Sequence, residues 1–395
     1  MKLSYRPEID GLRGISIILV ILYHLKISVK NQNLFEFGYL GVDIFFVISG
    51  YLIGRIVLKK ISEKNFSFKS FYENRARRLL PALIFTIFLS LFLAITFLLP
   101  IDLIDYAKSI LSTIFFSSNF FFFFTDIQYD AKNSLLLPLL HTWSLSVEEQ
   151  FYLFFPITIF LIIKYFQKFL LFFIVLGVFL SLILAEFIDS NISKSLNFFM
   201  LPTRIWELLI GTLIAFLELK KKHVVNKYKK NKIFPFFGFS LIFFSLLIFD
   251  NSTKHPSILS LIPIVGVGLI LFSQMDQRDQ ILKFLSSKIL VNVGLISYSL
   301  YLIHFPILAF YRIYFGVLNL SDIFFVTPFI FLISFLSYKY VEKPFRDKKI
   351  VKVKKLIFLL IVSFLVLISS SLYLINSKRL SFRLPEIFSN ESHIR

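Results

Sequence analysis

Residues 169–188 read FLLFFIVLGVFLSLILAEFI, a run of twenty residues with one charge, Glu186. A helix of about 20 mostly apolar residues crosses the hydrocarbon core of a bilayer, so this run predicts a transmembrane helix. The composition agrees, because 57% of the 395 residues are hydrophobic, only 17% are charged and the mean hydropathy is +0.77. A soluble domain has about 25% charged residues and exposes little contiguous apolar surface. The chain has no cysteine, which excludes disulfides, thiolate metal sites and a cysteine nucleophile.

Comparable runs recur along the chain and predict an all-α polytopic membrane protein with eleven transmembrane helices. The predicted spans are residues 14–32, 39–58, 81–100, 147–163, 169–188, 203–219, 233–250, 256–274, 289–311, 322–341 and 356–376. The first run is too long for a cleaved signal peptide and lacks a cleavage site, so it predicts a retained anchor. Residues 109–124 are short and contain Ser117, Ser118 and Asn119, which predicts a re-entrant or interfacial helix.

The net charge of +19 is concentrated in two segments, residues 55–78 and the lysine-rich residues 220–232. Basic loops remain on the cytoplasmic side of a membrane, so both segments and the N-terminus are predicted to be cytoplasmic and the C-terminus external. Roughly three quarters of the basic residues then lie on one side. Because no extended basic domain exists, we interpret the charge as a topology signal and expect no nucleic-acid partner.

Ionisable residues inside predicted spans are functional candidates, since a charge at mid-membrane costs about 2.5–3.5 kcal/mol. Arg13 and His24 are 11 residues apart in the first predicted helix, which puts them about 16 Å apart on one helix face. Histidine exchanges protons near neutral pH, although a packed, hydrogen-bonded core histidine is the plainer alternative. Asp43, in the segment GYLGVDIFFVISG (38–50), needs a buried partner such as an arginine.

Three arginines, Arg75, Arg77 and Arg78, stand just before Pro81 at a predicted cytoplasmic helix entrance. They could simply anchor the topology. A guanidinium also matches a phosphate bidentately, better than an ammonium does, so the same arginines could hold a phosphorylated cosubstrate. The residue types alone do not separate these two interpretations.

Further candidates lie at the predicted outer ends of spans and near the end of the chain. They are His141, Trp143 and Glu148 in HTWSLSVEEQFY (141–152), Arg204 and Trp206 in LPTRIWE (201–207), His304 in SYSLYLIHFP (297–306), and Glu342 in YVEKPFR (340–346). Each has a structural alternative: Glu148 as a helix N-terminal charge, Arg204 paired with Glu207, His304 in the core, and Glu342 solvated. No spacing typical of a metal site or of a serine-nucleophile elbow occurs.

The ordered set of these segments resembles the acyltransferase-3 family of bacterial inner-membrane acyltransferases, which includes O-antigen and peptidoglycan O-acetylases. The matching segments are RPEIDGLRG (6–14) with Arg13 and His24, GVDIFFVISG (41–50), ENRARRLLPA (73–82), HTWSLSVEEQFY, TRIWELLIG (203–211), SYSLYLIHFP and YVEKPFR, spanning about residues 5 to 346. Each motif is weak alone, but seven in the family's order are hard to obtain by chance.

The resemblance implies ten core helices and the transfer of an acyl group, usually acetyl, from cytoplasmic acyl-CoA. The implied acceptor is a hydroxyl of a glycan or lipid-linked saccharide on the outer side. His24 corresponds to the family's catalytic histidine and Arg13 to its motif partner, and we expect Arg13, like Arg75 and Arg78, to meet the phosphates of CoA. Arg75 and Arg78 correspond to a cytoplasmic arginine pair for the phosphates of CoA, and Glu342 to a functionally important glutamate. The outer-side residues Asp43, His141, Trp143, Glu148, Arg204, Trp206 and His304 are then candidates for binding the acceptor.

Some members of this family add an eleventh helix and an external hydrolase-like domain of the SGNH kind. Here we expect a membrane acyltransferase domain over residues 1–350, an additional helix over 351–377 and a short external tail over 378–395 without a catalytic pattern. The implied mechanism needs neither a metal nor another cofactor. The pantetheine arm of CoA would run along the first helix, and His24 would act as general base or as an acyl carrier.

Two other classes of function remain alternatives. A secondary transporter, or a flippase for a lipid-linked sugar, suits many helices with buried charges, but it predicts inverted repeats that the sequence does not display. A structural subunit of a polysaccharide assembly with a decayed active site would be expected to have lost Arg13, His24, Arg75 and Arg78, which are all present. The sequence specifies neither the acceptor, nor the acyl chain length, nor the oligomeric state.

Overall fold

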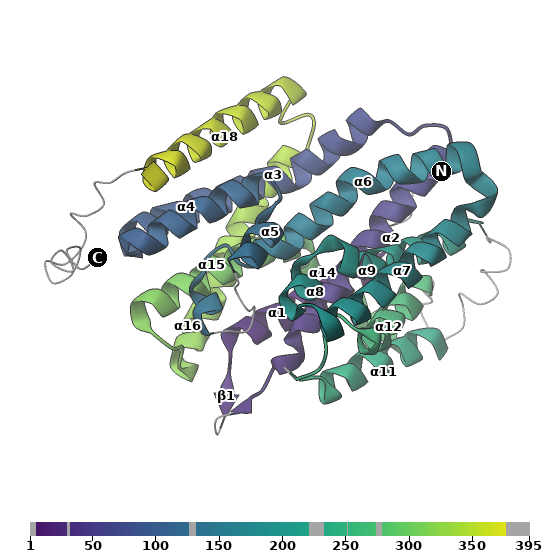
Figure 1. The fold of residues 1–395 in the computed structure, drawn as a ribbon, viewed down its shortest axis with the longest axis horizontal. Coiled ribbons are helices and arrows are strands. Elements are labelled where there is room, and N and C mark those ends of the chain that lie inside the picture. Colours follow the sequence, from purple (N-terminus) through teal and green to yellow (C-terminus); the bar gives the residue numbers. More distant parts are fainter. Residues whose placement is uncertain are drawn as a thin grey trace, which may run out of the picture. The chain divides into compact units, whose positions relative to one another are not determined.

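A computed structural model describes residues 5–29, 32–125, 132–220, 233–250, 252–273 and 279–376 (Figure 1). Helices dominate these residues, and six helical stretches are long and apolar enough to cross a membrane, or seven if one bent pair counts as a single span. The prediction of an all-α polytopic membrane protein is confirmed. The lysine-rich residues 221–232 and the tail 378–395, on which two predictions rest, lie outside the described residues.

The chain forms two compact units, each built from separated segments: Met1–Lys69 with Val147–Tyr301, and Ser70–Ser146 with Leu302–Arg395.

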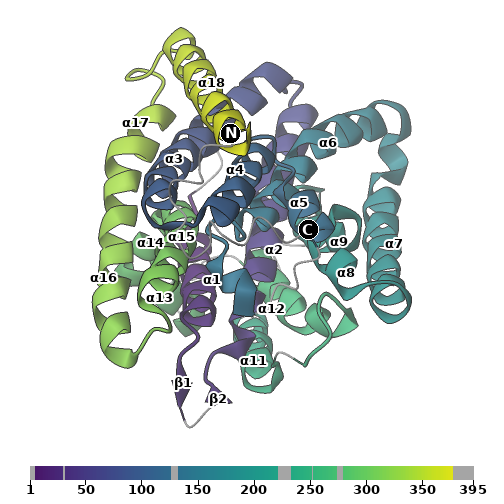
Figure 2. The ribbon, with the colours of Figure 1, turned by 60° about the vertical axis from the view of Figure 1, so that its left-hand side comes forward.

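The first unit contains the N-terminal helix and most of the middle of the chain. Its elements are α1 (Pro7–Leu25), the strands β1 (Ser28–Val29) and β2 (Gln32–Asn33), η1 (Glu36–Tyr39), α2 (Leu40–Ser62), most of α6 (Thr142–Phe166), η3 (Gln167–Phe169), α7 (Leu170–Asn191), α8 (Lys194–Phe199), α9 (Leu201–Lys220), α11 (Ile233–Ile248), η4 (Ile258–Ser260), α12 (Leu261–Phe272), α13 (Gln280–Leu285), α14 (Lys288–Leu295) and the start of α15 (Ser297–Phe315). The strands form a short antiparallel hairpin after α1 (Figure 2). Helix α2 packs against α9, α9 against α7, α1 against α14, and α11 against α12.

The second unit contains most of α3 (Phe68–Phe97) and the C-terminal helices. Its other elements are α4 (Pro100–Ile114), α5 (Ser118–Phe124), η2 (Lys132–Leu136), the rest of α15, α16 (Leu320–Ser337), the π-helical turn η5 (Tyr338–Glu342), α17 (Lys343–Arg346) and α18 (Val353–Asn376). Helix α18, the predicted eleventh span, packs along α4 (Figure 1).

Every predicted span overlaps a helix, but several boundaries were wrong. The first helix runs from Pro7 to Leu25 and not over 14–32, because the proline suits a helix start and Lys26 adopts a left-handed conformation that ends it. The predicted span 289–311 is broken between α14 and α15, which meet at an angle of 68°. Helix α12 has only 12 residues where a span over 256–274 was predicted.

Two predicted non-spanning segments also differ. Residues 109–124 are not one helix, since α4 ends at Ile114, Phe116 is left-handed and α5 begins at Ser118. The basic segment 55–78 is mostly helical, and only residues 63–67 connect α2 to α3. Arg75, Arg77 and Arg78 therefore lie inside a helix and not on an approach to one.

Candidate functional site

Helix α1 carries both Arg13 and His24. It is continuous between them, so eleven residues of helical rise separate their Cα atoms by about 16 Å. The Arg13 guanidinium donates from Nη1 to Asp10 Oδ1 at 3.2 Å and from Nη2 to Ser297 Oγ at 2.8 Å. Its side chain is 12% exposed. Arg13 thus fixes the first turns of α1 to the first residue of α15.

The glycines of the RPEIDGLRG segment let α1 approach its neighbours closely. A Cβ added to Gly14 would lie 2.4 Å from the carbonyl oxygen of Leu290 on α14. In the facing helix, a Cβ on Gly294 would lie 1.7 Å from the carbonyl oxygen of Asp10. Small residues at such crossings allow backbones to touch. This backbone contact holds the α1 turn that carries Asp10 and Arg13.

His24 lies in the last turn of α1, not in the middle of a span as predicted, because the helix ends at Leu25. It is nevertheless only 2% exposed. The ring of Tyr23 meets the His24 ring edge-on, with centroids 5.2 Å apart, and also meets the ring of Tyr39 at 6.1 Å. A buried imidazole among aromatic rings at a helix end can exchange protons with a group that reaches this end of α1.

Asp43 has the buried arginine partner that the sequence required. Arg204 Nη1 lies 3.0 Å from Asp43 Oδ1 and 3.0 Å from Glu207 Oε1, so α2 and α9 are joined by a three-residue ionic contact. All three side chains are completely buried. Arg204 also donates from Nε to the carbonyl oxygen of Phe198 at 3.2 Å and stacks over its ring. The expected i, i+3 pair of Arg204 and Glu207 is therefore present, within a larger cluster.

His255, which belongs to none of the sequence motifs, joins this cluster. Its Nε2 lies 3.0 Å from Arg204 Nη1 and 3.3 Å from Asp43 Oδ1, and its Nδ1 lies 3.2 Å from Ser260 Oγ. Its ring also contacts Tyr39, with centroids 4.6 Å apart. Burial and the neighbouring Arg204 hold the pKa of His255 well below its usual value. A lone histidine in a predicted loop has no neighbours in sequence that would indicate this contact.

Glu148 and Trp206, two candidates for the acceptor, have different surroundings. Glu148 is partly buried and accepts hydrogen bonds from Ser49 Oγ at 3.0 Å and from the Tyr152 hydroxyl at 3.1 Å. Trp206 is fully buried in the hydrophobic core of the first unit, packed with residues such as Ile48. Glu148 is therefore more accessible than Trp206.

In the second unit, the three arginines of α3 differ in how deeply they are buried. Arg77 is 1% exposed and donates to Glu73 Oε1 at 2.8 Å and to the carbonyl oxygens of Phe345 and Val351. Arg75 and Arg78 are partly exposed and, three residues apart, share one face of the helix. Arg77 is a structural anchor, whereas Arg75 and Arg78 are less buried.

Glu342 is fully buried, so the alternative that it is merely solvated was wrong. It ends the π-helical turn η5, and Arg346 one turn later donates to its Oε1. Such turns occur often at functional sites, because the extra residue redirects side chains that a regular helix would place elsewhere.

His141 and His304 come together in the second unit. Their ring centroids are 5.7 Å apart, both side chains are completely buried, and the His141 ring stacks on Phe305 at 5.3 Å. Burial and the nearby His304 hold the pKa of His141 well below its usual value. Trp143, two residues after His141, is 1% exposed. These three candidates lie in a packed interior and not on an open surface.

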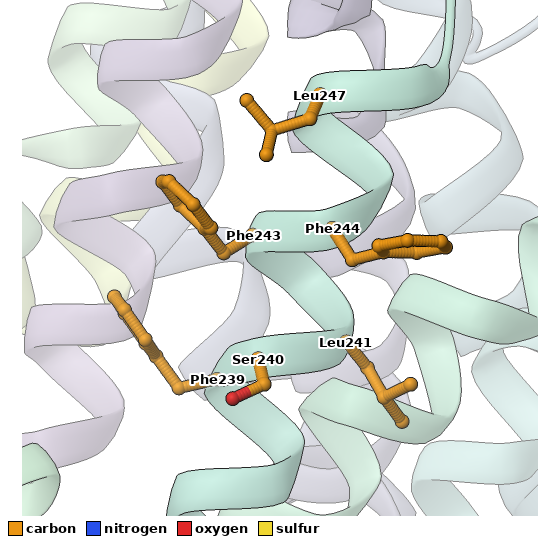
Figure 3. Close-up of a pocket in the computed structure, with 6 residues that line it drawn as sticks. All are labelled: Phe239, Ser240, Leu241, Phe243, Phe244 and Leu247. Carbon is orange, nitrogen blue, oxygen red and sulfur yellow. The ribbon is translucent and has the colours of Figure 1, made fainter.

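A groove of about 610 Å³ on α11 contains none of the candidate polar residues. It is lined by Phe239, Ser240, Leu241, Phe243, Phe244 and Leu247 (Figure 3). The side chains of Phe239 and Phe243 project to one side of the helix and those of Leu241 and Phe244 to the other (Figure 3). An apolar helix face of this kind suits contact with lipid and offers no group for acid–base chemistry.

The family with the description "Acyltransferase domain" matches residues 6–339, which include α1, the Asp43–Arg204 contact and the α3 arginines. The chain belongs to this acyltransferase-3 family. It is similar to two proteins of Staphylococcus aureus, "Putative O-acetyltransferase SAS0844" of strain MSSA476 and "Putative O-acetyltransferase SAR0937" of strain MRSA252. The identity to each is 37% over 364 residues, and the alignment covers 88% of this chain and 58% of the relative. It is 30% identical to O-acetyltransferase OatA of S. aureus strain NCTC 8325, over 87% of this chain and 58% of the relative.

The acyltransferase-3 chain described here therefore spans about 58% of the length of the curated relatives it matches. No solved structure matches it. Within the first unit the fold places Arg13 and His24 on one helix and joins Asp43 to Arg204. Glu207 and His255 are the two members of this buried cluster that the motifs do not predict as site residues.

Proposed function

We propose that this chain is an O-acyltransferase that moves an acyl group, first of all acetyl, from acyl-CoA to a hydroxyl of a glycan or lipid-linked saccharide. The observation that carries the proposal is the match of residues 6–339 to the acyltransferase family, together with relatives named as O-acetyltransferases. The buried histidine at the end of α1 supplies a group with the chemistry that such a transfer needs.

His24 is the proposed base. Its neutral ring nitrogen removes the proton of the acceptor hydroxyl while the hydroxyl oxygen attacks the thioester carbonyl carbon. The carbon–sulfur bond then breaks, the acyl ester is formed, and the proton passes to the departing CoA thiolate. In the other form of the step, the His24 nitrogen attacks the thioester carbonyl carbon and the carbon–sulfur bond breaks, which gives an acyl-imidazole and the CoA thiolate. The acceptor hydroxyl oxygen then attacks the acyl-imidazole, the carbon–nitrogen bond breaks, and the hydroxyl proton passes to the thiolate. Both forms use the same atoms and release CoA.

Arg75 and Arg78 are the proposed contacts for the phosphates of CoA, because they share a helix face and remain partly exposed. Arg13 already donates to Asp10 and Ser297, which favours a role in positioning α1 over direct phosphate binding. Glu342, buried beside Arg346, is the remaining candidate from the resemblance and is proposed to act as a positioning residue in the second unit.

The membrane location follows the same proposal. The N-terminus and the basic ends of α2 and α3 lie on the cytoplasmic side of a bacterial inner membrane, where acyl-CoA is made, and the acceptor lies outside. CoA is large and highly charged, so only the acyl group crosses. Outer-end residues, foremost Glu148, orient the acceptor, and the buried pair of Asp43 and Arg204 joins α2 to α9.

The test uses the full chain in membrane vesicles that contain a surface glycan, supplied with acetyl-CoA labelled in the acetyl group. Mass spectrometry should find one added acetyl group per modified sugar with the wild type. We expect His24→Ala to lose this product at normal abundance, while the control His223→Ala retains it. Retained transfer in His24→Ala contradicts the catalytic role, and glycan movement without acylation would identify a transporter or flippase instead.

For the arginines, Arg75→Lys should raise the KM for acetyl-CoA, since an ammonium cannot make the forked phosphate contact. Lys69→Arg, at an exposed position in the first turn of the same helix, is the matched control and should leave KM unchanged. An unchanged KM for acetyl-CoA in Arg75→Lys would show that Arg75 makes no forked phosphate contact and serves only to anchor the membrane topology.

A further inference from the structure

A short basic turn connects the last two membrane helices of the second unit. The continuous helical stretch Leu320–Arg346 and helix α18 (Val353–Asn376) are both long and apolar enough to cross a membrane, and only residues 347–352 separate α17 from α18 (Figure 2). Six residues reach about 20 Å at most, even when they are fully extended. The turn therefore lies at the membrane surface, at the level of the lipid headgroups.

The charge of this turn and of its flanks is strongly one-sided. Residues 343–355 contain seven basic residues and one acidic residue, Asp347. All six lysines among them are exposed: Lys343, Lys348, Lys349, Lys352, Lys354 and Lys355. A topology signal explains why basic residues occur at a helix end, but it does not require that their charges stay unpaired in the folded protein.

Two carboxylates beside the turn already have cationic partners. Glu342 accepts a hydrogen bond from Arg346. Glu73 on α3 lies 2.8 Å from Nε of Arg77 and 3.3 Å from Nζ of Lys348. These two carboxylates are therefore engaged with cations other than the remaining lysines.

The one acidic residue of the turn shapes its backbone. Asp347 Oδ1 accepts from the backbone N–H of Lys349 at 2.8 Å, and the Asp347 carbonyl oxygen accepts from the N–H of Val351 at 3.0 Å. Buried Arg77 closes the turn from the α3 side, because it donates to the carbonyl oxygen of Val351 at 2.6 Å and to that of Phe345 at 3.2 Å. The turn is thus a braced structure that holds its lysines in place.

Five lysines of this segment make no ion pair with any residue in the part of the chain that the structure describes. They are Lys343, Lys349, Lys352, Lys354 and Lys355. Like charges held so close together repel one another, and an anionic partner outside the chain relieves this repulsion. Ile350, at the tip of the turn, is 61% exposed. An exposed apolar side chain among lysines suits the boundary between headgroups and acyl chains.

We propose that residues 343–355 form a docking surface for the headgroup phosphates of anionic phospholipids in the adjoining leaflet, with Ile350 inserted at the acyl boundary. Anionic headgroups attract lysines beside a membrane helix within about one Debye length, roughly 8–10 Å. Phospholipid is favoured over a soluble phosphate compound because the turn is held at the surface where lipid phosphates are concentrated. The five unpaired lysines supply the charge, and Arg77 and Glu73 keep the turn in position.

The apparent Tm of the purified full chain in a neutral detergent tests this proposal, with phosphatidylglycerol or phosphatidylcholine added. A lipid that binds the folded protein raises the Tm. The test variant combines four neutral substitutions: Lys349→Gln, Lys352→Gln, Lys354→Gln and Lys355→Gln. We expect the rise produced by phosphatidylglycerol to shrink to less than half of the wild-type rise in this variant. Phosphatidylcholine should act equally on both proteins.

The matched control replaces the same four lysines by arginine, which keeps the charge, and it should retain the wild-type rise with phosphatidylglycerol. Added salt should reduce that rise, since it screens exposed charges. The melting temperatures without added lipid show whether each variant is folded.

Two results would overturn the proposal. One is an equal rise with phosphatidylglycerol in the wild type and the glutamine variant. The other is a lysine-dependent rise with acetyl-CoA in phosphatidylcholine but none with phosphatidylglycerol, which would assign the surface to the cosubstrate. None of these measurements uses acyl transfer, so their outcome is independent of the proposed function.

Discussion

The backbone contact between α1 and α14 makes Gly294→Ala the most informative single substitution in the first unit. The added Cβ would lie 1.7 Å from Asp10 O and 2.5 Å from its carbonyl carbon, whereas a real Cβ atom essentially never comes within 3.0 Å of a heavy atom of another helix. The two helices must therefore separate by roughly 1.3 Å. Neither contact atom is the end of a flexible side chain, so the backbone itself has to move.

The expected loss of stability follows from two opposing terms. Forced overpacking costs about 1–3 kcal/mol, and a rigid backbone partner places this site at the upper end. Replacing a helical glycine by alanine returns about 0.5–1 kcal/mol. The net loss is about 2 kcal/mol, which corresponds to a decrease in apparent Tm of roughly 4–8 °C for a unit of this size.

The same displacement moves the α1 turn that bears Arg13. Misplacement by about 1 Å can reduce a catalysed rate about 100-fold, so acetyl transfer by Gly294→Ala should fall by up to that factor at equal abundance. Thermal unfolding in detergent and transfer in vesicles measure the two effects. Gly268→Ala is the matched control, because its Cβ would meet only the flexible Cδ1 of Ile214 at 3.1 Å. If the two alanine variants melt and transfer alike, the close approach does not constrain α1.

Three other substitutions test individual contacts by the apparent Tm of the purified protein. Arg77→Ala should cost about 3 kcal/mol, because it leaves the Glu73 carboxylate and two backbone carbonyls without their buried donor, and Arg77→Lys should not restore it. Tyr51→Phe should cost about 1–3 kcal/mol, since its buried hydroxyl accepts from Arg6 at 2.7 Å; an unchanged Tm would show that this contact contributes nothing. Thr142→Val should cost about 1–2 kcal/mol by removing a buried hydroxyl that makes three hydrogen bonds, and a neutral result would contradict that estimate.

The fold class and the family could be predicted from the sequence because hydropathy and motif order are local properties. The start of the first helix could not. A hydropathy window excludes residues 7–13 for their charges, but Asp10 and Arg13 pair with each other, and Ser297, far along the chain, completes the contact. These contacts satisfy the charged side chains in the folded protein. A hydropathy window cannot detect them and therefore scores the charges as unfavourable for a membrane helix.

The candidate site was predictable to the extent that each residue's role depends on its own helix. The spacing of Arg13 and His24 alone predicts that both side chains lie on one face of one helix. The difference between Arg77 and its neighbours could not, because it depends on carbonyl groups of residues 345 and 351. His255 was missed for the same reason, since its partners lie more than 50 residues away in α9 and more than 200 away in α2.

The π-helical turn that ends at Glu342 has a consequence for comparing this chain with others. A π turn arises when a helix contains one residue more than the regular repeat needs, so every position after it is rotated by about 100°. A homologue with a regular helix here would align correctly only with a one-residue gap between Tyr338 and Glu342. Without that gap, the residue aligned with Glu342 would lie on a different face of the homologue's helix. The homologue's equivalent glutamate would then be aligned one position away, and the homologue would be taken to lack it.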